Sequence, residues 1–364
     1  MKNLIKMGIK AKYASSVSVS EKIKNKILLN FVKLIKANKK KILIENKKDV
    51  LRARRLNLKE NMIKRLELDE KKIKNIEESI KDIIKIKDPT YKVLKRWKAP
   101  SGLDISRVTI PIGVIGIIYE SRPNVTADVS CLCFKSGNSV ILRGGSEAYN
   151  SNKILSNLFR RSLRYFKVNE NFVQFINSKD RKVVKFILSK MSKYIDVLIP
   201  RGGKGLVKTV QKYSKIPIIG HLEGICHTFI DKNANLNMAK EIVLNAKMRN
   251  TSICGATETL LIHEKVLKKY INPILSVLEK ENCKIYGDKN VRKFYEGKIF
   301  VANEIDWSKE YLTSKISVKT VKNVSDAVKH INKYGTMHTD AIITTNSNAA
   351  KYFLKNVKSS IAIH

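Results

Sequence analysis

The sequence lacks the cysteine patterns that mark disulfide-stabilised or zinc-binding proteins. It has five cysteines among 364 residues, an odd number with no Cys-x-x-Cys pair, so we expect neither a disulfide framework nor a zinc ribbon. Cys226, His227 and the nearby His221 are conceivable metal ligands, but no second spaced pair completes a tetrahedral site. We therefore expect no bound metal and a reducing, cytoplasmic setting.

Long apolar segments are also absent. No run of 18 uncharged apolar residues occurs, and the first residues contain no apolar stretch followed by a small-residue cleavage site, so we expect neither a membrane span nor a secretory signal. The first 20 residues are basic and contain serine, which is only weakly typical of a transit peptide. They lead directly into a helical pattern, which explains them more plainly.

Acidic residues are scarce. There are 32 Asp and Glu against 72 Lys and Arg, giving a net charge of +40, a balance typical of nucleic-acid partners. The lysines are spread along the whole chain, however, and aromatic residues make up only 7%, too few to provide stacking platforms for single strands. We expect salt-sensitive adhesion to polyanions but no specific nucleic-acid binding.

The common phosphate-binding fingerprints are missing as well. Neither Gly-x-Gly-x-x-Gly nor Gly-x-x-x-x-Gly-Lys-Ser/Thr occurs, so an ordinary Rossmann motif and a P-loop are both excluded. The segment Arg201-Gly-Gly-Lys-Gly205 offers backbone amides and a cation to a phosphate, but alone it is a weak signal.

The patterns that are present indicate two α/β domains. With 43% hydrophobic residues the chain can bury a large core, and 364 residues exceed what one core usually organises. Residues 18–51 repeat apolar side chains at helical spacing behind a capping-box pattern of Ser18 and Glu21, and a second helical stretch follows to Ile84. Both are typical of packing elements with lysine-rich solvated faces.

From residue 103 onward the pattern changes to strands. Residues 103–119 begin as an alternating run and continue as an apolar one, which indicates a half-exposed strand followed by a buried strand. Later apolar runs alternate with helical or glycine-rich segments, which indicates parallel βαβ units in a doubly wound sheet. These strands are predicted at 140–142, 172–176, 197–199, 217–219 and 228–230.

Polar segments follow several of these strands. Because ligands of open parallel sheets bind beyond the carboxyl ends of the strands, we expect the functional residues in these segments. The segments are 120–126, 143–147, 200–205 and 220–227.

Cys254 is the best candidate for a nucleophile. It ends an irregular polar segment, is followed by Gly255, and precedes a strand-like run. A loop of small residues leaves the sulfur accessible and lets backbone N–H groups approach a developing charge. The alternative is a buried and inert thiol, because free cysteine is among the most buried residue types.

Taken in order, these segments resemble the gamma-glutamyl phosphate reductase branch of the aldehyde dehydrogenase superfamily. The resemblance implies an α/β fold that is aldehyde dehydrogenase-like, with two doubly wound α/β domains and an oligomerisation hairpin. Seven ordered matches are far more specific than any single motif, and they cover essentially the whole chain. They are 110–126, 136–147, 200–205, 223–227, 245–247, Cys254 with 258–261, and 330–335 with 338–339.

The resemblance implies NADPH-dependent reduction of L-glutamate 5-phosphate to L-glutamate 5-semialdehyde with release of phosphate, a step of proline biosynthesis. Cys254 would attack the acyl phosphate and form a thioester, which divides one hard step into two easier ones. Asn124 matches the superfamily asparagine whose side-chain amide helps to form the oxyanion hole. Without the resemblance, a turn residue after Pro123 is the plainer interpretation of Asn124.

The resemblance also implies a set of cofactor-binding residues and favours NADP over NAD, since an arginine beside the adenosine ribose suits a 2′-phosphate. Each residue taken singly is at least as consistent with a solvated surface position. The set comprises Arg143 and Glu147 at the adenosine ribose, Arg201, Gly202 and Gly203 at the pyrophosphate, and Glu310 at the nicotinamide ribose.

Four further residues are expected to bind the substrate. Arg122, His221 and Arg249 are cationic or potentially cationic groups that suit the carboxylate or phosphate of L-glutamate 5-phosphate. Glu223 aligns with the superfamily base that activates hydrolytic water, a role that a reductase does not need. Its function stays open between activation of the cysteine and binding of the substrate amine, with a polar residue at a strand end as the plain alternative.

We expect an NADP-binding domain over residues 1–222, with the hairpin at about 103–119, and a catalytic cysteine domain over 223–364. A homo-oligomer is expected. The family pattern continues beyond the strand that begins near Ser359, so we expect this domain to be C-terminally incomplete. Two alternatives remain: an inactive or split remnant of such an enzyme, and a basic binding protein on a borrowed fold.

Overall fold

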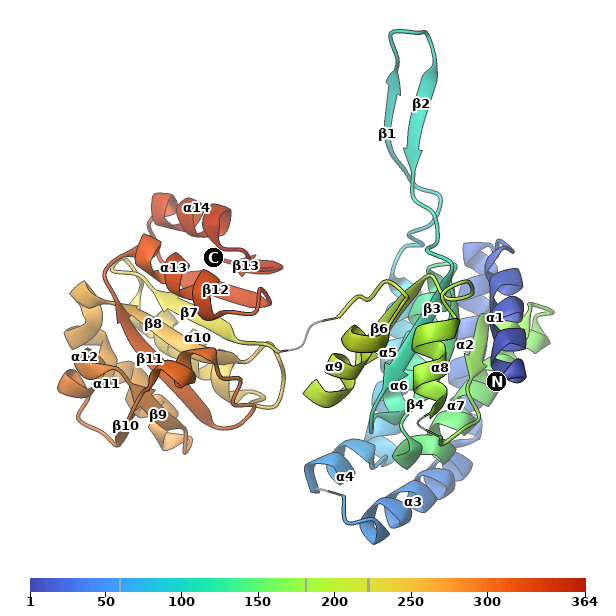
Figure 1. Cartoon of the computed structure of the whole chain (residues 1–364), viewed down its shortest axis with the longest axis horizontal. Coiled ribbons are helices and arrows are strands. Elements are labelled where there is room, and N and C mark those ends of the chain that lie inside the picture. Colours follow the sequence, from blue (N-terminus) through green and yellow to red (C-terminus); the bar gives the residue numbers. More distant parts are fainter. Residues whose placement is uncertain (59, 181, 221–222) are drawn as a thin grey trace. The chain divides into compact units, whose positions relative to one another are not determined.

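The computed structural model describes residues 1–58, 60–180, 182–220 and 223–364. The chain divides into two compact units, Met1–Gly220 and His221–His364, close to the expected boundary between residues 222 and 223. Each unit is an open parallel sheet with helices on both faces (Figure 1). In the described residues, no helix is both long and apolar enough to cross a membrane.

The first unit contains a four-stranded parallel sheet in the order β5-β4-β3-β6. Every residue of β3 and β4 is buried, because this sheet is covered on both sides. Its strands are β3 (Val114–Tyr119), β4 (Ser139–Gly144), β5 (Val173–Phe175) and β6 (Val197–Arg201).

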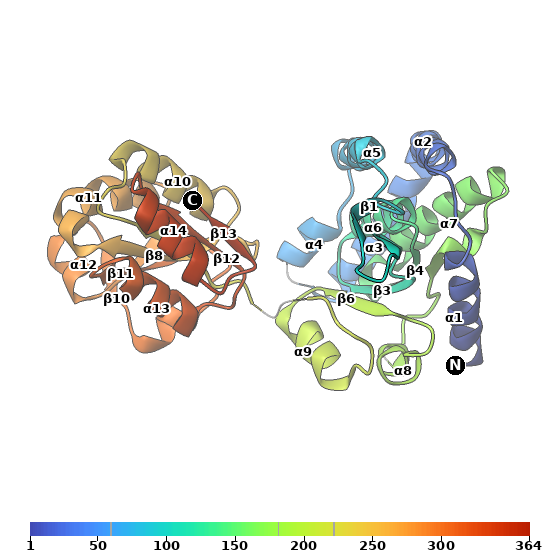
Figure 2. The ribbon, with the colours of Figure 1, turned by 90° about the horizontal axis from the view of Figure 1, so that it is seen from above.

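Alternate side chains of β3 point to opposite faces of the sheet. Ile115 and Ile117 pack with helices α2, α5, α6 and α7, whereas Val114 and Ile118 pack with α1, α8 and α9. Figure 2 shows α8 and α9 on one side of the sheet and α2 and α5 on the other. The helices of this unit are α1 (Lys2–Ser15), α2 (Glu21–Ala37), α3 (Lys39–Arg55), α4 (Glu60–Leu66), α5 (Glu70–Lys85), α6 (Pro123–Lys135), α7 (Tyr149–Tyr165), α8 (Lys182–Lys190) and α9 (Lys204–Tyr213), with short 3₁₀ turns η1 (Ser146–Ala148) and η2 (Glu170–Phe172).

The hairpin lies earlier in the chain than the sequence predicted. Strand β1 (Val93–Lys98) pairs with β2 (Asp104–Val108) in an antiparallel ribbon whose turn contains Gly102 at φ 87° (Figure 1). The expected hairpin at 103–119 was therefore wrong in its bounds. The run that becomes β3 is apolar throughout, so it is buried between β4 and β6 instead of folding back on β2.

Three other local predictions were wrong. The helix expected over 18–51 is interrupted at Asn38, whose side-chain amide donates to the carbonyl of Leu34 and ends α2. The expected capping box is not formed: α2 begins after Ser20, and the Glu21 carboxylate accepts instead from Asp88 N–H and from Lys135. The strand predicted at 217–219 is reduced to a single bridge between Leu198 and Ile218.

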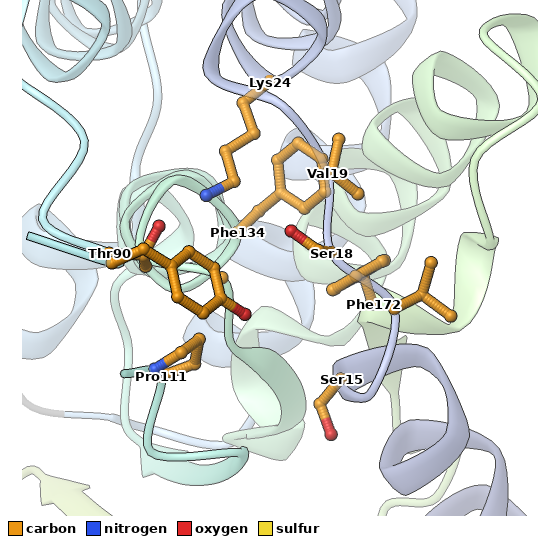
Figure 3. A pocket seen from close by; sticks show the side chains of 11 residues that line it. Ser15, Ser18, Val19, Lys24, Thr90, Pro111, Phe134 and Phe172 are labelled. Carbon is orange, nitrogen blue, oxygen red and sulfur yellow. The ribbon is translucent and has the colours of Figure 1, made fainter. Parts of the chain in front are cut away.

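A small cavity lies beneath the hairpin of the first unit, near the amino ends of the strands (Figure 3). Its volume of about 10 Å³ is close to that of one water-sized probe, so it cannot hold a substrate. On its wall Lys24 forms a 2.7 Å ion pair with Asp88. This ion pair ties α2 to the segment that leads into β1.

The second unit contains a seven-stranded parallel sheet in the order β10-β9-β11-β8-β7-β12-β13. One face is covered by α10, α11 and α12, and the other by α13 and α14. The predicted α/β, aldehyde dehydrogenase-like class of two doubly wound sheets is confirmed. The elements are β7 (Cys226–Ile230), α10 (Leu236–Met248), β8 (Thr257–His263), α11 (Glu264–Lys280), β9 (Lys284–Gly287), α12 (Lys289–Phe294), β10 (Ile299–Val301), η3 (Glu304–Ser308), β11 (Lys315–Val321), α13 (Val324–Tyr334), β12 (Thr339–Ile343), α14 (Ser347–Asn356) and β13 (Ile361–Ile363).

Candidate active site

The loop that connects α10 to β8 presents Cys254. This thiol is partly exposed, whereas the other four cysteines are buried. Burial raises the pKa of Cys133 and of Cys226 to about 12, which keeps these thiols protonated and unreactive. Among the five, Cys254 is therefore the one that a substrate in solution can reach.

The backbone of Cys254 is held against the start of β7. A Cβ atom at Gly224 would lie 1.9 Å from the carbonyl oxygen of Cys254, so only glycine fits at this position. Two residues further on, the Cys226 thiol donates to the same carbonyl at 3.1 Å and lies 3.6 Å from Nδ1 of His338. These contacts hold the loop of Cys254 against the segment at the start of β7.

A buried ion pair closes the loop that carries Cys254. Lys247 in the last turn of α10 contacts Glu258 in β8 at 2.7 Å, and both side chains are completely buried. Burial raises the pKa of Glu258, and the charge of Lys247 opposes the rise. The second carboxylate oxygen accepts from the N–H of Leu312 at 3.1 Å.

The segment after η3 forms another wall of this region. Glu310 accepts a 2.8 Å hydrogen bond from the N–H of Gly224, and Leu312 has a φ of 52°, which is unfavourable for a bulky side chain. Met337, next to His338, also has a positive φ of 58°. Strained backbone of this kind is often found at functional sites.

In the first unit the loop that follows β3 makes two carboxylate contacts. The N–H and hydroxyl of Ser121, whose φ is 36°, donate to Glu147 Oε1 at 2.8 and 3.0 Å. Glu120 Oε2 accepts from the N–H of Gly203 at 2.8 Å. Gly203 caps α9, so the Glu120 carboxylate lies where an anion would meet this helix N-terminus.

Arg143, expected at the adenosine ribose, is mostly buried. It is 7% exposed, and its Nη1 donates to the carbonyl of Gly144 at 2.8 Å. Arg201, by contrast, is exposed at the end of β6. An added Cβ at Gly202 would lie 2.7 Å from the Glu120 carboxyl group, so a side chain there would displace this carboxylate.

The remaining expected residues lie in both units. Asn124 is exposed near the start of α6, and its side-chain amide is 3.2 Å from Asp128; Arg122 precedes this helix and is half-buried. In the second unit, Glu223 is half-buried beside Gly224, and Arg249 is exposed at the end of α10. His221 lies outside the described residues.

Each unit gathers some of the expected residues. The second unit brings Cys254, Gly224 and Glu310 together, and the first brings Glu147, Gly202 and Gly203 to the strand ends after β3, β4 and β6. Sequence reasoning assigned no role to Lys247, Glu258 or Glu120. The sequence did indicate Lys247 and Glu258, because each is a charged residue within or beside an apolar run. In the part of the chain that is described, no three His, Cys, Asp or Glu side chains are arranged to hold a metal.

Comparison with known proteins assigns the class. The sequence profile of the aldehyde dehydrogenase family matches residues 12–292, and the chain belongs to this family. Within it, the chain is 42% identical to the gamma-glutamyl phosphate reductase of Bartonella tribocorum over 361 residues, covering 98% of this chain and 88% of that protein. A gamma-glutamyl phosphate reductase of Clostridium botulinum is 40% identical over 362 residues, covering 99% and 87%.

A solved structure agrees with the sequence relatives. The crystal structure of gamma-glutamyl phosphate reductase from Thermotoga maritima is 37% identical, covers 99% of this chain and 87% of its own, and superposes with a TM-score of 0.94. The chain is thus a member of the gamma-glutamyl phosphate reductases, and the predicted resemblance is confirmed.

Proposed function

We propose that this chain reduces L-glutamate 5-phosphate to L-glutamate 5-semialdehyde and phosphate in the biosynthesis of proline. The observation that carries the proposal is the partly exposed thiol of Cys254. Its loop is held by the Cys226 contact and by the Lys247–Glu258 ion pair, and the chain belongs to the gamma-glutamyl phosphate reductases. An acyl phosphate is an activated carbonyl with a good leaving group, and a positioned thiolate is the nucleophile that suits it.

In the proposed reaction the Cys254 sulfur attacks the acyl carbon, and the bond to the phosphate oxygen breaks. The product of this step is a thioester on Cys254 together with free phosphate. The side-chain amide of Asn124 donates to the oxyanion formed during the attack. When bound, the reduced nicotinamide supplies the hydride that converts the thioester to a thiohemiacetal, whose collapse releases the aldehyde and the thiol.

As an aldehyde dehydrogenase the chain takes a nicotinamide cofactor, and we propose NADP. Several features fit such a group: Gly202 brings its backbone close to the Glu120 carboxyl group, the N–H of Gly203 donates to that carboxylate, and Arg201 is exposed beside them. These residues would hold the pyrophosphate. Arg143 and Glu147 are proposed for the adenosine ribose and Glu310 for the nicotinamide ribose.

For the substrate, we propose that Arg122, His221 and Arg249 bind its carboxylate or phosphate groups. Glu223 is half-buried beside Gly224 and hence near the carbonyl of Cys254. From this position its carboxylate either activates the Cys254 thiol or binds the substrate amine. Replacing it by Gln separates the two roles, since loss of activation lowers kcat and loss of amine binding raises KM.

The β1–β2 ribbon supports a homo-oligomer. Both strands are exposed along almost their whole length, and Leu94 and Trp97 are 57% and 42% exposed. A two-stranded ribbon is marginal by itself, so we propose that a second copy covers it. Trp97→Lys should lower the mass measured by light scattering, while the matched exposed change Tyr165→Lys on α7 should leave it unchanged.

The test of the activity is the reverse reaction, in which purified protein reduces NADP with L-glutamate 5-semialdehyde and phosphate. We expect a rate that requires phosphate and is lost in Cys254→Ala. A rate that survives this substitution, or no rate in the intact protein, would overturn the proposal. The setting we propose is the reducing cytoplasm, in which the five free thiols persist.

A further inference from the structure

A basic groove lies between helices α3 and α7 of the first unit. Its volume is about 610 Å³, which is in the range of sites that hold small molecules or short peptide segments. One wall is formed by α3 and the other by α7. The charged residues that line it are Lys41 and Glu45 on α3 and Lys153, Arg161 and Arg164 on α7.

The groove lies on the face of α7 that is turned away from the parallel sheet. Leu155, Phe159 and Leu163 pack α7 into the core of the first unit. Lys153 and Arg161 each precede one of these residues by two positions, which places them on the opposite face of a helix with 3.6 residues per turn. The groove is therefore distinct from the strand ends proposed for the cofactor.

Three cations of the groove have no acidic partner. Lys41, Lys153 and Arg161 are exposed, and none forms an ion pair with any residue that the structure describes. Among the described lining residues the one acid is Glu45, and it accepts from Lys48 at 2.6 Å. The groove therefore has an excess of positive charge that an anionic ligand would balance.

The spacing of charges along α7 fits an extended peptide. Lys153 and Arg161 are eight residues apart, which is about 12 Å along a helix. In an extended chain, side chains four residues apart point to the same side and are separated by about 13 Å. Between the two cations, Ile154 and Leu158 line the groove and give it an apolar floor. A side chain midway between two carboxylates would pack on this floor.

The remaining lining also favours a peptide over a nucleic acid. The part of the lining that is described contains no aromatic side chain, so bases have no ring to stack on. The guanidinium group of Arg161 matches a carboxylate in a bidentate geometry. The exposed amide of Asn157 can donate to and accept from a peptide backbone.

We propose that this groove binds an acidic peptide segment of a partner protein, in an extended conformation and with the pattern Glu-x-Leu-x-Glu or its Asp equivalent. Arg161 and Lys153 pair with the two carboxylates, and the apolar side chain packs on Ile154 and Leu158. Lys41 adds positive charge from the opposite wall. The site is independent of the chemistry of Cys254.

The test is fluorescence anisotropy of a labelled Glu-Thr-Leu-Thr-Glu peptide with the full chain at about 0.15 M salt. We expect Arg161→Gln and Lys41→Gln each to weaken binding by about five- to tenfold. Lys81→Gln is the matched control and should bind as the parent does, because Lys81 is an exposed lysine on α5 outside the groove. All three variants should keep the unfolding midpoint of the parent, since the side chains are exposed.

A second peptide tests the apolar floor without any change to the protein. Glu-Thr-Ser-Thr-Glu has the same charge and should bind about fivefold more weakly, because the contact with Ile154 and Leu158 is lost. Equal binding of the two peptides, or no binding of either, would overturn the proposal. So would an equal loss in Lys81→Gln, since the effect would then be one of total charge. If Arg161→Gln weakens the binding of oligouridine more than that of the peptide, the groove is a nucleic-acid site and the peptide assignment is wrong.

Discussion

Lys247 and Glu258 form a completely buried ion pair of 2.7 Å that joins the two ends of the Cys254 loop. Lys247→Met should lower the free energy of unfolding by about 3–5 kcal/mol, because it leaves Glu258 buried without its partner. The double variant Lys247→Met/Glu258→Gln should recover most of this loss, since it removes both charges and keeps an acceptor for Leu312. Urea unfolding measures both effects.

The control for this pair is Lys333→Met, which removes an ion pair whose two side chains are 66% and 70% exposed. Its unfolding curve should hardly change, because exposed pairs contribute little. If Lys247→Met were as harmless as Lys333→Met, the buried pair would not hold the loop.

Gly224 contacts the Cys254 carbonyl and Gly255 follows Cys254 in the chain, yet alanine should have opposite effects at these two positions. A Cβ at Gly224 would be 1.9 Å from the Cys254 carbonyl, whereas one at Gly255 meets nothing within 4 Å. Gly224→Ala should therefore displace the loop, which lowers the unfolding midpoint and lowers kcat by at least about a hundredfold. Gly255→Ala should keep the unfolding midpoint of the parent, and equal effects of the two changes on stability would contradict this geometry.

The strands and the exposed loop position of Cys254 could be predicted from the sequence, but these contacts could not. Apolar runs identify β3 and β4 because burial on both faces requires them, and small polar neighbours identify the loop of Cys254. The closeness of Gly224 to Cys254 depends on β7 pairing with β8. Pairing between distant segments is a tertiary property that no local pattern carries.

The hairpin illustrates the same limit. Strand β2 was predicted within 103–119, but its partner was not, because β1 has the sequence Val-Leu-Lys-Arg-Trp-Lys and no buried face. Arg143 was expected as a cofactor ligand, and its burial against Gly144 depends on packing that the motif does not encode.

Thiol labelling should distinguish Cys254 from the other cysteines. In the native protein at about pH 8, a disulfide reagent should modify one thiol of the five, because the other four are buried and burial raises their pKa values. Denaturation should release all five. Rapid reaction of a native Cys254→Ser variant would show that another thiol is accessible.

The Lys24–Asp88 ion pair predicts a pH dependence of stability. Burial acts to raise the pKa of Asp88, but the bonds from Lys24 and Thr90 outweigh it and lower the pKa below its ordinary 3.8. The ionised carboxylate therefore stabilises the fold above that value, and the contribution is lost as the pH falls through the lowered pKa.

In a comparison with Asp88→Asn, the intact protein should be more stable by about 2 kcal/mol above about pH 5. The difference should shrink below pH 3.8, the ordinary pKa. Urea unfolding at several pH values measures it. A difference that grows on acidification would mean that the carboxylate destabilises the fold when ionised.

Removing the charge of Glu120 should strengthen the binding of NADP. Its carboxylate accepts from the N–H of Gly203 at the start of α9, so it competes with any phosphate for the same donor and the same positive end of the helix. Glu120→Gln removes the charge and keeps the size of the side chain. NADP should then bind about two- to fivefold more tightly in calorimetric titration, whereas 2′-AMP, which has no pyrophosphate, should bind as before. Weaker binding of NADP by the variant would mean that Glu120 orders the loop for the cofactor and does not occupy its place.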